Sequence, residues 1–520
     1  MSNVAKFLPK APGATSRFSR TTRTKIVFSV VWALYLIVSL GLSTGVGIGI
    51  ADNGDGARVF APSGLNPVSE NGLAKGQGYV VTDFVAGSSR DPQKVINRMA
   101  TIHYPTLNSY IMTSLGVLSP DRTVSLFAVG WIYLLIGLTI IWLVPLGKGL
   151  LSVAIVFGAL ALGPFARWVV STYADTPAFF GMAAVLSAFV VATKAVSARE
   201  FLQLNGLVWV GSLLLALSKA AYVIAVPFVL ALWLVALAVF QREHLKQFLR
   251  IPLGLTTAIG VALVAGSSFA QFTSSDRYES GRINSFHFTL DVAMTYLPQE
   301  AIDQAIPQNI QAMSPERYWP RAGGWLEVEE WQETFENHSL MNSLRLQVLS
   351  QPVTAYLIVS EAISASTEPD ISYLPPNTWS TPEPPPIAVV PAALYEGTVV
   401  FVETLLTPLS FATANIMFIV VAALLAIGLL LLVRRWQPGE GIAALAGQLT
   451  ALLWLSGLFG GFYAGVAVLG DGFSELEKHA ILSSYMFVIF TASLIALVVV
   501  AGVAWWRSKT THSTSTPANA

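Results

Sequence analysis

Long stretches of apolar residues with few charges recur along most of the chain. A helix that crosses a bilayer needs about 20 mostly apolar residues, and ten stretches approach or exceed that length. They lie at approximately 26–50, 124–145, 150–165, 175–193, 203–217, 221–240, 251–270, 414–433, 441–468 and 480–506. None alternates polar and apolar residues as the strands of a membrane barrel do. The pattern predicts an all-α polytopic membrane protein with about ten transmembrane helices.

The segments between these stretches divide the chain into regions. Residues 93–117, 339–363 and 392–411 combine apolar and polar positions and are predicted to form helices on the membrane surface. The regions are a basic tail at 1–25, a first span at 26–50, a first outer loop at 51–123, six spans within 124–270, a large outer loop at 271–413, three spans within 414–506 and a polar, disordered tail at 507–520.

The distribution of Lys and Arg orients the chain. Residues 1–25 hold six basic residues and no acid, and basic segments stay in the cytoplasm. Ten spans then place 16 basic and three acidic residues inside, and leave 14 basic and 27 acidic residues outside. We therefore expect a multi-pass membrane protein with both termini cytoplasmic and the two large loops extracytoplasmic.

Composition excludes several classes of protein and of chemistry. Only 12% of residues are charged, against about 25% in soluble domains, and a formal net charge of zero argues against binding nucleic acid. The absence of cysteine excludes disulfides, thiolate metal sites and a cysteine nucleophile. No Walker-type loop is present, so any chemistry is expected on the outer side.

Two carboxylates follow the first apolar stretch directly. Asp52 and Asp55 lie among glycines in the segment Asp52-Asn53-Gly54-Asp55-Gly56-Ala57-Arg58. A carboxylate at the outer surface is suited to act as a general base. The alternative is a plain turn, since Asn-Gly and Asp-Gly are common turn dipeptides.

A second polar segment, residues 470–479, precedes the last stretch. The spacing of Ser474 and Glu477 matches a capping box and predicts a helix that begins near Ser474. Lys478 and His479 would then lie near a helix N-terminus, which disfavours cations. Either Glu475 or a bound phosphate compensates for this, and both explanations stay open.

Several isolated polar residues are further candidates for a functional site. Lys219 lies between two apolar stretches, where an ionisable side chain is either functional or extends towards lipid headgroups. His103 and Tyr104 lie in the first outer loop, and Asp175 either binds substrate or caps the helix that follows it. The further outer cations are Arg58, Arg167, Arg277 and Arg282.

These features together resemble the GT-C superfamily of integral-membrane glycosyltransferases. The match covers the arrangement of spans and two large outer loops, the first of which carries an acid soon after the first span. The element His103-Tyr104-Pro105 is similar to one in lipid A aminoarabinose transferases and protein O-mannosyltransferases. The segments 52–58 and 470–479 are similar to those of bacterial cell-wall or surface-polysaccharide transferases. Relatives often have adjacent acids in the first loop, whereas Asp52 and Asp55 are three apart.

The resemblance implies an inverting transfer of a sugar from a polyprenyl-phosphate donor to a glycan or glycolipid acceptor, among membrane lipids. Asp55 or Asp52 would deprotonate the acceptor hydroxyl, and cations would stabilise the departing phosphate. The implied phosphate-binding residues are Lys219, Lys478, His479, Arg282 and Arg58, and the implied substrate-binding residues are His103, Tyr104, Asp175, Asp471 and Glu475. No cofactor and no metal site is expected, although a divalent cation stays possible.

Two other functions compete with this one. A transporter or flippase of a lipid-linked glycan would have internal repeats and broken helices, and no repeat is evident. A membrane O-acyltransferase would need a histidine deep in a span, and only His479 lies close to one.

Overall fold

The structure is a computed structural model of the 520-residue chain. It describes residues 20–44, 59, 64–67, 83–86, 105–194, 196–242, 251–273, 284–312, 334–335, 337–368, 389–411, 414–436, 440–472 and 476–513.

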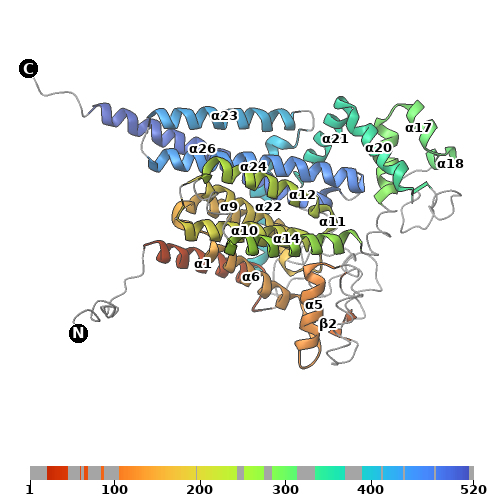
Figure 1. Cartoon of the computed structure of the whole chain (residues 1–520), viewed down its shortest axis with the longest axis horizontal. Helices are drawn as coiled ribbons and strands as arrows, with labels where there is room; N and C mark the ends of the chain where they lie inside the picture. The colour runs from red at the N-terminus through yellow and green to blue at the C-terminus, as the bar shows by residue number, and fades with distance from the viewer. Residues whose placement is uncertain are drawn as a thin grey trace, which may run out of the picture.

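A bundle of long helices forms the body of the protein (Figure 1). Each of the ten predicted stretches overlaps one of its helices. These are α1 (Arg20–Ser39), α6 (Leu126–Leu143), α7 (Leu150–Ala161), α9 (Thr176–Ala192), α10 (Ala198–Ala216), α12 (Ala225–Phe240), α14 (Ile251–Phe272), α23 (Asn415–Trp436), α24 (Glu440–Asp471) and α26 (Ile481–Ser513). Helices suit a lipid environment because they satisfy their own backbone hydrogen bonds.

The lengths of these helices support a polytopic membrane protein. Six are long and apolar enough to cross a bilayer: α1, α6, the unit of α11 (Ala220–Val223) and α12, α23, α24 and α26. Two pairs of helices that meet at a bend raise the number to eight. Helix α9 is shorter, and every one of its 17 residues is buried in protein. The predicted number of ten crossings therefore stays a prediction.

The two ends of the bundle differ. Helix α1 begins and α26 ends at one end, which we call the termini end (Figure 1). Helices α5 (Leu107–Leu118), α17 (Gln299–Ala305), α18 (Gln308–Gln311) and α20 (His338–Ser350) lie at the opposite end, which we call the far end. The described part of the chain thus begins and ends at the same end of the bundle, and the side of the membrane on which the termini lie stays a prediction.

The first predicted loop contributes a small sheet that the sequence pattern did not reveal. Strands β1 (Leu65–Pro67), β2 (Asp83–Ala86) and β3 (Thr123–Ser125) pair antiparallel in that order. Three or four residues are too few to show a period of two, so only pairing identifies them. The surface helix predicted at 93–117 is seen from Leu107 as α5, and residues 93–104 lie outside the described part.

The second predicted loop is also helical. After η3 (Phe288–Ala293) and α16 (Met294–Tyr296), the surface helix expected at 339–363 is two helices, α20 and α21 (Pro352–Ala365), bent by 98°. The bend falls at Pro352, because proline cannot donate the hydrogen bond that would continue the first helix. The stretch expected at 392–411 corresponds to α22 (Val389–Leu406) and the turn η7 (Thr407–Leu409).

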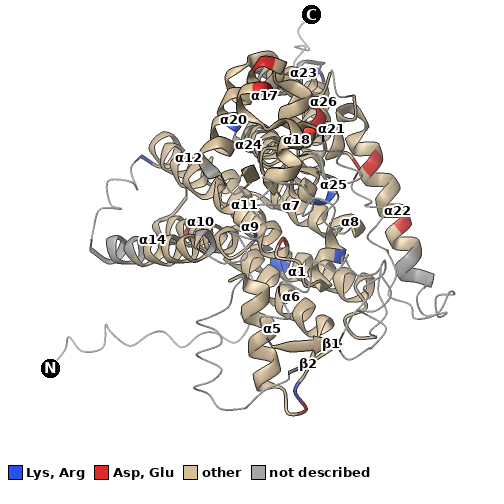
Figure 2. Ribbon diagram, turned by 90° about the vertical axis from the view of Figure 1, so that its right-hand side faces the viewer, with Lys and Arg blue, Asp and Glu red and all other residues tan. Residues whose placement is uncertain are grey.

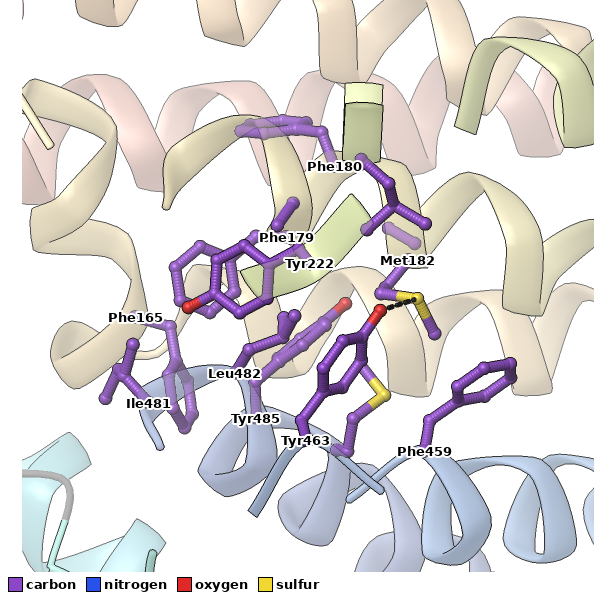
Figure 3. Packing of buried hydrophobic residues seen from close by; sticks show 14 of the residues in the cluster. Phe165, Phe179, Phe180, Met182, Tyr222, Phe459, Tyr463, Ile481, Leu482 and Tyr485 are labelled. Atoms are coloured by element: carbon purple, nitrogen blue, oxygen red, sulfur yellow. Dashed lines mark hydrogen bonds between the residues drawn. The ribbon is translucent and has the colours of Figure 1, made fainter. Parts of the chain in front are cut away.

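Aromatic side chains and glycines pack the interior. Phe165, Phe179 and Tyr485 meet at ring-centroid distances of 5.5–6.2 Å (Figure 3). Helices α9 and α10 approach closely at two glycines, where a Cβ on Gly181 would lie 2.8 Å from the backbone oxygen of Gly211. Small residues permit such close packing of membrane helices.

Candidate functional site

The third predicted span is broken inside the bundle. Helix α7 ends at Ala161, and the chain bends by 68° into α8 (Gly163–Ala166) and η2 (Arg167–Val170). The amide of Gly163 donates to Thr398 Oγ1 of α22 at 3.0 Å, and a Cβ at this position would lie only 2.5 Å from that oxygen. Gly163 is therefore required where α8 meets α22.

The break leads residues 171–175 through the interior without helical hydrogen bonds. Asn108 of α5 donates to the carbonyls of Ser171 and Tyr173, and Tyr133 of α6 donates to Asn108 Oδ1. Irregular backbone at membrane depth is tolerated only where protein or a cavity surrounds it. Two neighbouring helices thus hold this loop in place.

Three charged side chains are buried here. Arg167, Asp175 and Lys478 are at most 3% exposed. The Arg167 guanidinium carbon lies 5.7 Å from the ring centroid of Tyr395, and Lys478 Nζ lies 5.9 Å from that of Tyr173. Charges buried in a membrane bundle are costly and are retained mainly for function.

Asp175 does not use its carboxylate to cap α9, although it occupies the N-cap position. Its Oδ1 instead accepts a hydrogen bond from the hydroxyl of Tyr222. The simple capping explanation for Asp175 is therefore wrong, and the carboxylate faces the α11 segment (Ala220–Val223).

Lys219 and His479, 260 positions apart in the chain, lie side by side, with Lys219 Nζ 2.6 Å from His479 Nδ1. When the ammonium donates, Nδ1 must be unprotonated, which places the imidazole proton on Nε2. A small pocket adjoins the pair. It is lined by Lys219, Ala221, Tyr222, Tyr463, Val466, Ala467 and His479.

The contacts close into a ring. Lys219 contacts His479, and the preceding residue, Lys478, lies over the ring of Tyr173. Asp175, two residues after Tyr173, accepts a hydrogen bond from the hydroxyl of Tyr222. The backbone amide of Tyr222 donates to the Lys219 carbonyl at 2.9 Å, which completes the ring. We call this set the Lys–His cluster: Tyr173, Asp175, Lys219, Tyr222, Lys478 and His479. Figure 2 views the far end and shows basic segments inside the bundle near α25 (Leu476–His479) and α8.

Lys478 and His479 lie just before the last long helix. They occupy the last turn of the four-residue helix α25, and the last long helix begins only at Ile481. Ser474, at which the predicted helix would begin, lies outside the described residues, so that helix start stays a prediction.

Gly472 has a structural reason for its identity. It follows the last residue of α24 with φ +67°, and its amide donates to the Val468 carbonyl at 2.8 Å. A Cβ would lie 2.7 Å from the carbonyl carbon and oxygen of His287. This glycine therefore terminates α24 against η3.

The other predicted site residues are not placed by the structure. Only the backbone of Asp471 is described, as the last residue of α24. Outside the described residues lie Asp52, Asp55, Arg58, His103, Tyr104, Arg282 and Glu475. The choice between Asp52 and Asp55 thus stays open.

Sequence reasoning missed the burial of Arg167 and the roles of Tyr173 and Tyr222 as contacts of charged groups. The Gly163-Pro164 pair inside the predicted third span was an available signal for a broken helix. Among the residues described, no three His, Cys, Asp or Glu side chains lie close enough to hold a metal ion.

Comparison with known families gives one match. The family described as the YfdI N-terminal transmembrane domain matches residues 15–516. The chain belongs to this family. The match runs from the basic tail through the last long helix, so the whole bundle is this transmembrane domain. No curated protein and no solved structure matches the chain.

Proposed function

We propose that this YfdI-type domain is a membrane glycosyltransferase that moves a sugar from a polyprenyl-phosphate donor to a cell-envelope glycan or glycolipid. The observation that carries the proposal is the convergence of Lys219, Lys478 and His479 at one site, where Lys478 is buried and the other two are part-buried. Cations gathered at one site between membrane helices suit a lipid phosphate. Membership of a transmembrane-domain family is consistent with this activity.

The Lys–His cluster would bind the donor phosphate. As the bond between the anomeric carbon and the phosphate oxygen breaks, negative charge grows on the phosphate, and fixed cations stabilise that charge. Lys219 and Lys478 supply positive charge. His479 would accept from Lys219 through Nδ1 and donate to the phosphate through Nε2–H. Arg58 and Arg282 are further candidates for the same role.

The acceptor side of the reaction needs one carboxylate. The acceptor oxygen bonds to the anomeric carbon with inversion, its proton passes to Asp55 or Asp52, and the phosphate leaves already ionised. Asp175 would orient Tyr222 beside the donor site and contact substrate. His103, Tyr104, Asp471 and Glu475 are proposed to contact the sugar or the acceptor.

A flippase of a lipid-linked glycan is the second candidate. The broken α7–α8 span favours it, because discontinuous helices at membrane depth are typical of transporters. Such a protein would bind the same lipid phosphate without making a covalent product.

The test uses purified full-length protein in lipid nanodiscs with a labelled polyprenyl-phosphate sugar and an envelope glycan acceptor. Lys478→Met and Lys219→Met are each expected to lower kcat/KM by about 100-fold or more. Of the variants Asp52→Asn and Asp55→Asn, the one that removes the general base should abolish transfer, and full activity in both would contradict the proposed base. Lys509→Met, at the exposed termini end, is the matched control. Full activity in both Lys219 and Lys478 variants contradicts the assigned phosphate site, and lipid translocation in liposomes without product supports the flippase.

A further inference from the structure

A second group of cations lies at the termini end, away from the Lys–His cluster. Lys25 of α1 donates to the Trp142 carbonyl at the end of α6 at 2.8 Å. Lys148 ends η1 (Leu146–Lys148), and its Nζ lies 2.8 Å from Glu200 Oε2. Lys194 follows α9, and Arg199 lies in the first turn of α10. We call Lys25, Lys148, Lys194 and Arg199 the basic rim.

Buried glutamines fix the backbone of this rim. Gln448 of α24 donates to the carbonyls of Lys148 and Val190, at 2.5 and 3.3 Å. Gln241, at the end of α12, donates to the carbonyls of Ala192 and Lys194, both at 2.6 Å. The segments that carry the lysines are therefore held together by the bundle.

The rim has an excess of positive charge. Glu200 is its one carboxylate among the described residues, and the same oxygen accepts from the Ser197 amide and hydroxyl at 2.7 and 2.9 Å in a capping box. Burial, together with the neighbouring charge of Lys148, lowers the pKa of Lys194. Within the described part of the chain, neither Lys194 nor Arg199 forms an ion pair.

Exposed apolar side chains adjoin the rim. Trp142, Leu151 and Leu202 are 41–52% exposed at the ends of α6, α7 and α10. A ligand that fits both features has an anionic head and hydrocarbon chains. Tryptophan at this depth is typical of the headgroup region, and basic pockets between spans bind acidic headgroups.

We propose that the basic rim binds the phosphate headgroup of an anionic phospholipid in the adjoining leaflet, with the acyl chains along α6, α7 and α10. This site is independent of the proposed transfer reaction, because it lies at the opposite end of the bundle. Its role is to anchor the α9–α10 connection to that leaflet.

The test measures binding of phosphatidylglycerol and phosphatidylcholine to the detergent-solubilised full chain by native mass spectrometry. The wild type is expected to prefer phosphatidylglycerol. Lys194→Gln with Arg199→Gln should weaken phosphatidylglycerol binding by about tenfold. The control pair Arg434→Gln with Arg435→Gln removes two exposed charges from α23. It should change phosphatidylglycerol binding less than twofold.

Further variants keep the result interpretable. The charge-preserving pair Lys194→Arg with Arg199→Lys should retain binding. If the neutral pair does not fold, each single neutral variant is expected to weaken binding about threefold. Equal losses in the rim and α23 pairs, no headgroup preference in the wild type, or complete displacement of the lipid by millimolar inorganic phosphate would each overturn the proposal.

Discussion

Gly472 combines two constraints at one residue, since its φ is positive and the His287 carbonyl occupies the space of a Cβ. We predict that Gly472→Ala lowers the free energy of unfolding by at least about 2 kcal/mol, from left-handed strain and the clash together. Gly470→Ala, two residues away, has open space around its Cβ and should be neutral. Thermal unfolding in detergent measures both, and equal stability of the two variants would contradict this explanation.

His287, which packs against Gly472, makes the stability of the fold depend on pH. Its side chain is buried with Nδ1 3.9 Å from Asp291 Oδ2, and burial lowers its pKa from 6.5 to about 4. The unfolded chain therefore takes up the proton at a higher pH than the folded chain, and acid favours unfolding. The contribution of neutral His287 to the free energy of unfolding is complete above pH 6.5 and is lost as the pH falls towards 4.

We predict that His287→Gln flattens the stability profile between pH 6.5 and pH 4, where the wild type should lose up to about 3 kcal/mol through this residue. Equilibrium unfolding at pH 7, 6, 5 and 4 compares the two proteins. Parallel profiles for wild type and variant would show that His287 does not protonate on unfolding.

At the scale of elements, the break between α7 and α8 determines where Arg167 and the loop 171–175 lie. Gly163→Ala would place a methyl 2.5 Å from Thr398 Oγ1 and 2.7 Å from the Tyr395 ring. We predict a loss of about 1–3 kcal/mol and a fall in transfer activity, because α8 must move away from α22. Gly158→Ala lies in α7 with open space at its Cβ, so it should keep both activity and stability.

At the scale of the whole molecule, the bundle places the two termini of its described part at one end and the Lys–His cluster towards the other. The chain has no cysteine, so introduced cysteines can be labelled without background. We predict that Asp121→Cys, in the exposed turn before β3, reacts with an impermeant maleimide in intact cells. Lys509→Cys and Arg199→Cys should react only after lysis, and labelling of all three in intact cells would contradict the orientation.

Several features were predictable because they depend on local composition. The apolar stretches predicted the helices since a bilayer demands about 20 apolar residues per crossing. Lys219 was recognisable as a cation between two apolar stretches, and Lys478 and His479 as cations near a predicted helix N-terminus. The three short strands depend on pairing between distant segments, which a pattern along the chain does not contain.

The sequence by itself determined that this protein is a helical membrane bundle with few interior charges, because a span is apolar at nearly every position and that composition is visible along the chain. Only the tertiary structure decided which charges meet. Lys219 and His479 are 260 positions apart, and Arg167 reaches the interior through a break whose geometry depends on α22. Such proximity comes from close packing of distant helices, and no local pattern encodes it.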